Sequence, residues 1–178
     1  MSELFFALLA VIVIYVGVRW ILSAQGQVEF AWPAKSAWSV SKVSDSFAQF
    51  TIKVLLKNET GIDLTIVDAF PRILLPEEQY KSARVFGRAV FGEDAREDGY
   101  WEAVIIPRRT GANLTLVLEI TSEAGTLEKA LAEMPDFNVD LYWQTVCRNP
   151  IRIEKQRFQI QAAELKKAFA EKGGADHD

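Results

Sequence analysis

Short alternating segments, closely spaced turns and few helical patterns predict a mainly β fold for residues 25–161, an antiparallel immunoglobulin-like β-sandwich. About seven to nine runs between Val28 and Ile160 alternate apolar and polar residues, which is the period of half-buried strands. Turn residues separate these runs at intervals of roughly 8–12 residues. A barrel with a similar number of strands is the structural alternative, whereas the alternation argues against a parallel sheet with crossover helices.

The strand pattern is clearest over residues 47–57 and 112–120, where apolar side chains recur at every second position. Further strands are predicted over 28–32, 37–43, 62–66, 80–91, 100–106, 137–147 and 151–160. The turn at 58–61 indicates either a hairpin or a corner between sheets. Residues 67–76 contain two prolines and predict a bent edge segment, and Gly87 favours a bulge within 80–91.

Two helices are predicted inside and after the sandwich. Thr126 has the residue type of an N-cap, and Pro135 ends a helical pattern over 126–134 that would bridge the two sheets. Residues 162–178 predict a weakly amphipathic helix over 162–172, followed by a disordered tail.

The first 24 residues predict a transmembrane anchor with short flanks. Leu4–Val18 contains no charged residue, and continuing the helix to Leu22 gives 19 residues, close to the roughly 20 that cross a hydrocarbon core. Trp20 is typical of the membrane interface, and the Arg19 guanidinium can reach the headgroups. The membrane is therefore an expected partner, contacted through residues 4–22.

A cleaved signal peptide and a buried core helix are the alternatives to a permanent single-pass anchor. A signal peptide normally begins with Lys or Arg, whereas Met1-Ser2-Glu3 carries no basic side chain. A buried helix is normally apolar along one stripe, whereas this run is apolar on every face. The side of the membrane stays open, because the basic residues after the run favour a cytoplasmic domain while signal-anchors commonly export β-domains.

Composition and single residues exclude several kinds of chemistry. The chain has 24 acidic and 20 basic residues, which does not fit a nucleic-acid-binding protein. Its one cysteine, Cys147, cannot form an intrachain disulfide and is expected to be buried and inert. Its one histidine, His177, lies in the tail, where no packing would position it for catalysis. The sequence predicts no enzyme activity and no cofactor.

Two charged regions are candidate binding sites. Glu93, Asp94, Glu97 and Asp98 form an acidic loop that is a weak candidate for Ca²⁺, although a solvated loop tip is the preferred interpretation. A basic docking face for anionic headgroups or an acidic partner is the second candidate, against an ordinary mixture of solvated charges. Its residues are Arg148, Arg152, Lys155, Arg157, Lys166 and Lys167. Two glycosylation triplets begin at Asn58 and Asn113.

The run FTIKVLLKNETGIDLTIVDAFPRILLP, with IIPRRTGANLTLVLEI and the closing paired strands, resembles the late-embryogenesis-abundant, water-stress-response β-sandwich family. The resemblance covers most of residues 28–160. That family typically has Asn-Pro where this chain has Asn58-Glu59. The resemblance implies a binding, chaperoning or structural module without catalytic residues.

The combined prediction is a single-pass, membrane-anchored β-sandwich that acts as a non-catalytic binding or structural module of a membrane or envelope complex. A protein partner is expected. The alternatives are a carrier of lipid or another small apolar ligand at the membrane surface and, behind it, a metal-dependent hydrolase.

Overall fold

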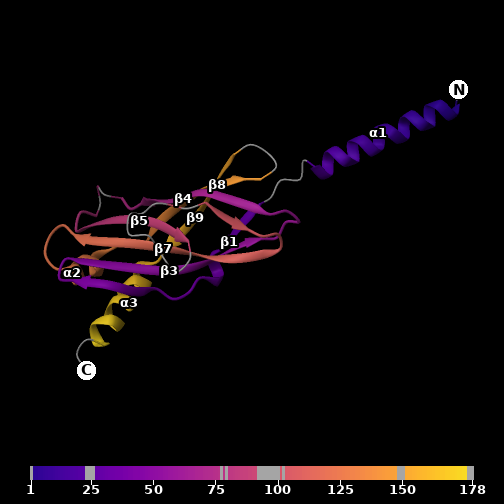
Figure 1. Cartoon of the computed structure of the whole chain (residues 1–178). Helices are drawn as coiled ribbons and strands as arrows, with labels where there is room; N and C mark the ends of the chain where they lie inside the picture. The colour runs from indigo at the N-terminus through magenta and orange to yellow at the C-terminus, as the bar shows by residue number, and fades with distance from the viewer. Residues whose placement is uncertain are drawn as a thin grey trace.

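The computed structural model describes residues 2–22, 27–76, 78, 80–91, 101, 103–147 and 151–175. A long N-terminal helix, α1 (Ser2–Leu22), precedes two antiparallel sheets that pack face to face, with two shorter helices against them (Figure 1). The sandwich begins at β1, two residues after residues 23–26, which lie outside this description. The buried apolar residues that the structure describes all follow α1.

The strands of the two sheets follow the order of an immunoglobulin constant-type domain. The first sheet runs β1-β3-β7-β5, with β2 on the same edge of β3 as β1, and the second runs β6-β4-β8-β9. With β1, β3, β4, β5, β7, β8 and β9 lettered A to G, the sheets read ABED and CFG. The predicted immunoglobulin-like sandwich is therefore confirmed, and the edge strands at the sheet ends exclude the barrel. The strands are β1 (Val28–Ala31), β2 (Ser39–Ser44), β3 (Phe47–Asn58), β4 (Leu64–Leu74), β5 (Ala83–Phe91), β6 (Val104–Ile106), β7 (Thr110–Ser122), β8 (Phe137–Val146) and β9 (Arg152–Ile160).

The core lies between the inner faces of the two sheets, where the alternation places it. The long central strands β3 and β7 pair over their whole lengths, and β4 and β8 face them from the other sheet. Burying a Leu or Ile side chain contributes about 1.5–3 kcal/mol, so these four strands supply much of the driving force for folding. Their buried apolar residues include Phe50, Ile52, Val54, Leu56, Leu64, Ile66, Leu114, Leu116, Leu118, Ile120, Val139, Leu141 and Trp143.

The turn after β3 is a corner between sheets, because β3 belongs to the first sheet and β4 to the second. Residues 67–74 continue the strand that begins at Leu64, so the two separate segments predicted there are one bulged strand, β4. The edge character predicted for Pro71 is correct. β6 pairs only with Leu64–Ile66, so the part of β4 that contains Pro71 pairs with β8 on one side only.

The bulge predicted at Gly87 is wrong. The pairing of β5 with β7 is continuous from Ala83 to Phe91, without a register shift. A Cβ atom at Gly87 would lie 2.8 Å from Ile73 Cδ1 and 3.1 Å from Pro71 Cγ of β4. Glycine is therefore needed where the two sheets approach each other closely, which sequence periodicity cannot distinguish from a bulge.

The two helices predicted inside and after the sandwich are present, although their end residues differ from the predicted ones. α2 (Leu127–Glu133) connects β7 of one sheet to β8 of the other, and the Thr126 hydroxyl accepts a hydrogen bond from the Lys129 backbone N–H at 3.4 Å. α3 (Ala162–Ala175) extends into the tail predicted to be disordered, and residues 176–178 lie outside the described residues. Leu165 is fully buried, and the Glu164 carboxylate accepts bonds from Lys35 Nζ and Trp38 Nε1, which fastens α3 to the sandwich.

The predicted N-terminal helix is present as α1, and its side chains are exposed over most of residues 4–20. Among the residues that the structure describes, no helix is long and apolar enough to span a bilayer.

Candidate binding site

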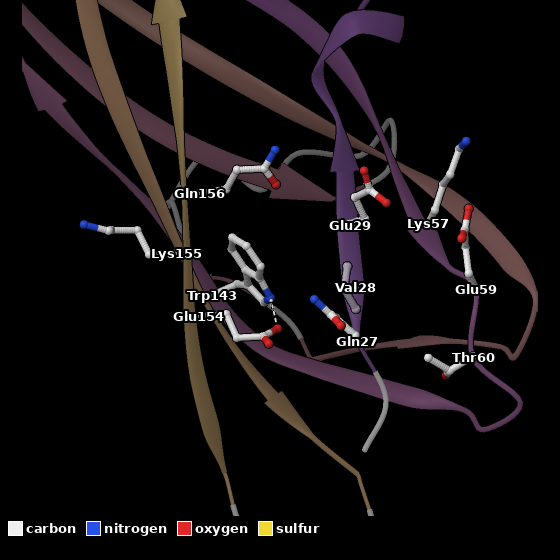
Figure 2. Close-up of a pocket in the computed structure, with 10 residues that line it drawn as sticks. All are labelled: Gln27, Val28, Glu29, Lys57, Glu59, Thr60, Trp143, Glu154, Lys155 and Gln156. Carbon is white, nitrogen blue, oxygen red and sulfur yellow. Dashed lines mark hydrogen bonds between the residues drawn. The ribbon is translucent and has the colours of Figure 1, made fainter. Parts of the chain in front are cut away.

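An open groove separates the edge strands β1 and β9, which end different sheets and do not pair with each other (Figure 2). The groove has a volume of about 410 Å³. Backbone N–H and C=O groups on an open strand edge can hydrogen-bond to another chain. The residues that line the groove are Gln27, Val28, Glu29, Lys57, Glu59, Thr60, Trp143, Glu154, Lys155 and Gln156. We call this site the β1–β9 groove.

Trp143 of β8 and Glu154 of β9 form a fixed part of the groove wall (Figure 2). The Trp143 indole is buried, and its Nε1 donates to Glu154 Oε2 at 3.0 Å. The other carboxylate oxygen of Glu154 lies 3.1 Å from Arg152 Nε. Phe30 packs edge-on against Trp143, with ring centroids 4.6 Å apart. These contacts hold the wall in one conformation and involve side chains, not the backbone groups of the strand edges.

The groove is closed at one end by a contact between the two edge strands. Gln156 Nε2 of β9 donates to the Phe30 carbonyl of β1 at 3.2 Å. This side-chain bond connects the two edge strands, which belong to different sheets and are not paired through their backbones. Trp32 and Phe158 stack beyond this contact, with centroids 4.5 Å apart.

The rim of the groove carries both signs of charge. Glu29 of β1 and Lys57 of β3 are cross-strand neighbours, and Glu59 lies in the corner that follows β3. No cluster of three or more His, Cys, Asp or Glu side chains suitable for a metal is present in the described part of the chain. The groove therefore offers polar side chains and the backbone groups of two strand edges to a bound molecule.

The outer face of the β6-β4-β8-β9 sheet lies next to the groove and carries the exposed Phe70 and the half-buried Tyr142. Phe70 and Tyr142 stack with centroids 5.3 Å apart, and Lys155 Nζ lies 5.8 Å from the Tyr142 ring. Asp140 is buried one row away, where Arg157 Nε and Nη2 donate to its two carboxylate oxygens at 2.7 and 3.0 Å.

Hydrogen bonding by Arg157 lowers the pKa of Asp140, and the charges of Arg157 and Lys155 act in the same direction against the effect of burial. The same bond raises the pKa of Arg157. The pair is therefore charged at neutral pH and fixes β9 against β8.

The described residues of the predicted basic docking face contact several different partners. Lys155 and Arg157 meet at Asp140, while Arg152 pairs with Glu154. Lys166 donates to the Ala132 carbonyl at the end of α2. Lys167 pairs with Glu171 along α3, and Arg148 lies outside the described residues. The basic docking face stays a prediction, and the sequence could not reveal which carboxylates and carbonyls these cations contact.

The other predicted site residues have different outcomes. The acidic loop with Glu93, Asp94, Glu97 and Asp98 lies outside the described residues, as does His177. Cys147 directly follows β8 and is half-buried, against the expectation of full burial, because the strand ends one residue earlier. It borders a second open cleft, of about 400 Å³, with Asp63 and Arg108.

The residues of the β1–β9 groove were not predicted as a site, except for Lys155, which was assigned to the basic docking face. The alternating pattern places Trp143 on the inner face of its strand, but it carries no information that β1, more than 100 residues earlier, faces β9. The sequence signal that could have indicated the groove is the presence of edge strands at both ends of the domain. The carrier and hydrolase alternatives stay predictions, because the clefts described at the surface do not select either of them.

No family model matches the sequence, and no curated protein matches it. Among solved structures, the chain is similar to the GAE domain of GGA2p from Saccharomyces cerevisiae, with 11% identity and a TM-score of 0.36, over 78% of this chain and 99% of that one. It is similar to the yeast GGA1 GAE domain, with 6% identity and a TM-score of 0.36, over 69% of this chain and 87% of that one. A protein from Archaeoglobus fulgidus has 10% identity and a TM-score of 0.34, over 76% of this chain and 98% of its own. Likenesses at these TM-scores assign no function, and the fold rests on the strand order alone.

Proposed function

We propose that this chain is a single-pass, membrane-anchored, non-catalytic binding module that receives a protein partner in the β1–β9 groove. The observation that carries the proposal is the open groove of about 410 Å³ between two strand edges, which Gln156 bridges at one end. Adding a strand to an exposed sheet edge is a general way to bind an extended segment.

The proposal of an anchor rests on the apolar run Leu4–Leu22 of the sequence and not on the described helices, none of which is long and apolar enough to span a bilayer. Arg19 and Trp20 at the end of the run suit the interface where the chain would leave the bilayer. The proposed location is a membrane, with the side of the sandwich left to experiment. The resemblance to the water-stress-response family agrees with a binding or structural role, and it stays a prediction.

The anchor is tested by washing membranes that contain the full chain with sodium carbonate. We expect the protein to stay in the membrane fraction, because carbonate strips peripheral proteins and leaves inserted helices. Release of the intact chain would contradict the anchor. Protease treatment of intact cells, with detection of a fragment of the sandwich, then shows which side of the membrane the domain occupies.

The binding role is tested with a photo-crosslinking amino acid at Glu29, on the exposed rim of the groove. A matched probe at Glu128, an exposed residue of α2 at the opposite end of the sandwich, serves as the control. We expect a discrete protein adduct from position 29 that is absent from position 128, and its loss when the bulkier side chains of Glu59→Trp and Gln27→Trp fill the groove mouth. Equal adducts from both positions would show non-specific proximity and contradict the groove.

A further inference from the structure

Three exposed isoleucines lie at one end of the β6-β4-β8-β9 sheet, Ile105 on one edge strand and Ile151 and Ile153 at the other edge. Ile105 of β6 is 65% exposed, Ile153 of β9 is 66% exposed, and Ile151, just before β9, is 61% exposed. Ile105 of β6 pairs with Thr65 of β4, which pairs on its other side with Val146 of β8. The neighbouring residue of β8, Thr145, pairs with Arg152 of β9, which lies between Ile151 and Ile153. These residues therefore occupy one end of the sheet, which we call the isoleucine end.

The isoleucine end is the end of the sandwich at which the chain enters from α1. Val28, the first residue of β1, pairs with Asn58 at the end of β3. Asn58 Nδ2 donates to the Ile106 carbonyl at 3.0 Å and to the Pro107 carbonyl at 3.2 Å, so β6 lies beside this point. Helix α2 lies at the opposite end of the sandwich (Figure 1).

The connection between α1 and the sandwich limits how far this end can move from the helix. Only residues 23–26 separate Leu22 from Gln27. Because an extended chain advances at most about 3.6 Å per residue, the five peptide steps span no more than about 18 Å. If α1 crosses a bilayer, its last turn is at the interface, and the isoleucine end is held within reach of the same interface.

We infer that the isoleucine end packs against the membrane surface, with Ile105, Ile151 and Ile153 entering the boundary between headgroups and acyl chains. This inference rests on the proposed anchor. Clustered exposed apolar side chains normally mark a contact surface. The turn between β6 and β7 adds the exposed cations Arg108 and Arg109 at the same end, where they can meet lipid phosphates.

A lipid surface is favoured over a protein partner because the isoleucine end is the end of the sandwich nearest to α1 in the chain. The membrane would be present at this end at all times, since the short connection fixes the distance. A partner protein or a second copy of the chain on the isoleucine end is an alternative that the following experiment separates.

The test uses the full chain in phosphatidylcholine vesicles that contain lipid with a nitroxide near the headgroup end of its acyl chain. Cys147→Ser removes the only cysteine, and Ile151→Cys or Ile153→Cys then carries an environment-sensitive fluorophore. Phe86→Cys is the matched control, because Phe86 is 62% exposed on the other sheet, paired with Glu119 near the α2 end. We expect strong quenching and a blue-shifted emission at positions 151 and 153, and neither at position 86.

Each outcome has a defined meaning. Retention in carbonate-washed vesicles without quenching at 151 and 153 overturns the inference and leaves the anchor intact. A blue shift at these positions without quenching indicates burial against a protein or a second copy, and it also overturns the inference. Release of the chain by carbonate overturns the anchor and the inference together. Equal quenching at position 86 shows that the domain lies on the bilayer in another orientation, which contradicts the isoleucine end as the contact.

Discussion

The Asn58 side chain links three segments at the corner between the two sheets. Its exposed fraction is 1%, and its Nδ2 donates to the carbonyls of Ile62, Ile106 and Pro107. Its Oδ1 accepts from the backbone N–H and the hydroxyl of Thr60. The glycosylation triplet at Asn58 is therefore a structural element, because the nitrogen that would carry a glycan is buried and already bonded.

Asn58→Ala is expected to lower the free energy of unfolding by about 3 kcal/mol, because several buried polar groups lose their partners at once. Thermal and urea unfolding of the purified chain measure the effect. Asn113→Ala is the control, since Asn113 is exposed on β7 and its replacement should change stability by no more than about 0.5 kcal/mol. A loss below 1 kcal/mol for Asn58→Ala would contradict this role.

Asp140 makes the stability of the sandwich dependent on pH. The hydrogen bond from Arg157 holds the pKa of Asp140 below its ordinary value, which is about 3.9 in an unfolded chain. The folded state therefore binds the proton less readily, so the contribution of Asp140 is present above the unfolded pKa and is lost as pH falls through the folded pKa.

The melting temperature of Asp140→Asn is expected to lie below that of the parent protein at neutral pH, with the difference narrowing below about pH 4. Calorimetric or circular-dichroism melts across this range give the comparison. Asp68→Asn on the same sheet face controls for the loss of one negative charge. A difference between Asp140→Asn and the parent that is the same at every pH would show that the carboxylate charge does not contribute.

Gly87 lies where strands β5 and β4 of the two sheets pack closely together. Gly87→Ala would place its methyl group 2.8 Å from Ile73 Cδ1, which is too short for a carbon contact. We expect a loss of stability of about 1–2 kcal/mol from this overpacking. Ile73→Val removes the Cδ1 atom, so the double variant Gly87→Ala with Ile73→Val should recover part of the loss. Denaturant unfolding of the four proteins of this cycle provides the measurement, and purely additive losses would contradict a direct clash.

The elements show which part of the fold the sequence determines by itself. Alternation predicts the core strands 47–57 and 112–120, because a sheet with one buried face repeats every two residues. It misjudges Gly87 and the continuity of β4, because a bulged strand and a close contact between sheets depend on partners that are distant in the chain. A helix start is easier to predict than these features, because it depends on residues that are close in the chain. Thr126 caps α2 as predicted.

At the scale of the molecule, the sequence predicts the two-sheet architecture better than the site. The β1–β9 groove forms where the first and last strands of the domain face each other, and the register that brings Gln156 to the Phe30 carbonyl is set by the whole sheet order. The ion pairs of Asp140 illustrate the same limit, because this residue of β8 contacts Lys155 and Arg157 of β9, which the sequence alone does not pair with it.

The sandwich is expected to fold without α1. The buried hydrophobic residues among those that the structure describes lie between Val28 and Ala168, so removing residues 1–26 takes away no core side chain. A fragment of residues 27–178 should give a β-rich circular-dichroism spectrum and unfold in one cooperative transition, within a few degrees of the full chain. A fragment that ends at 161 is the contrasting variant, since it loses the buried residues Ala162, Leu165 and Ala168 of α3 and should be clearly less stable. A mainly helical spectrum, or a broad transition for residues 27–178, would mean that the folding unit depends on α1, contrary to the distribution of the core.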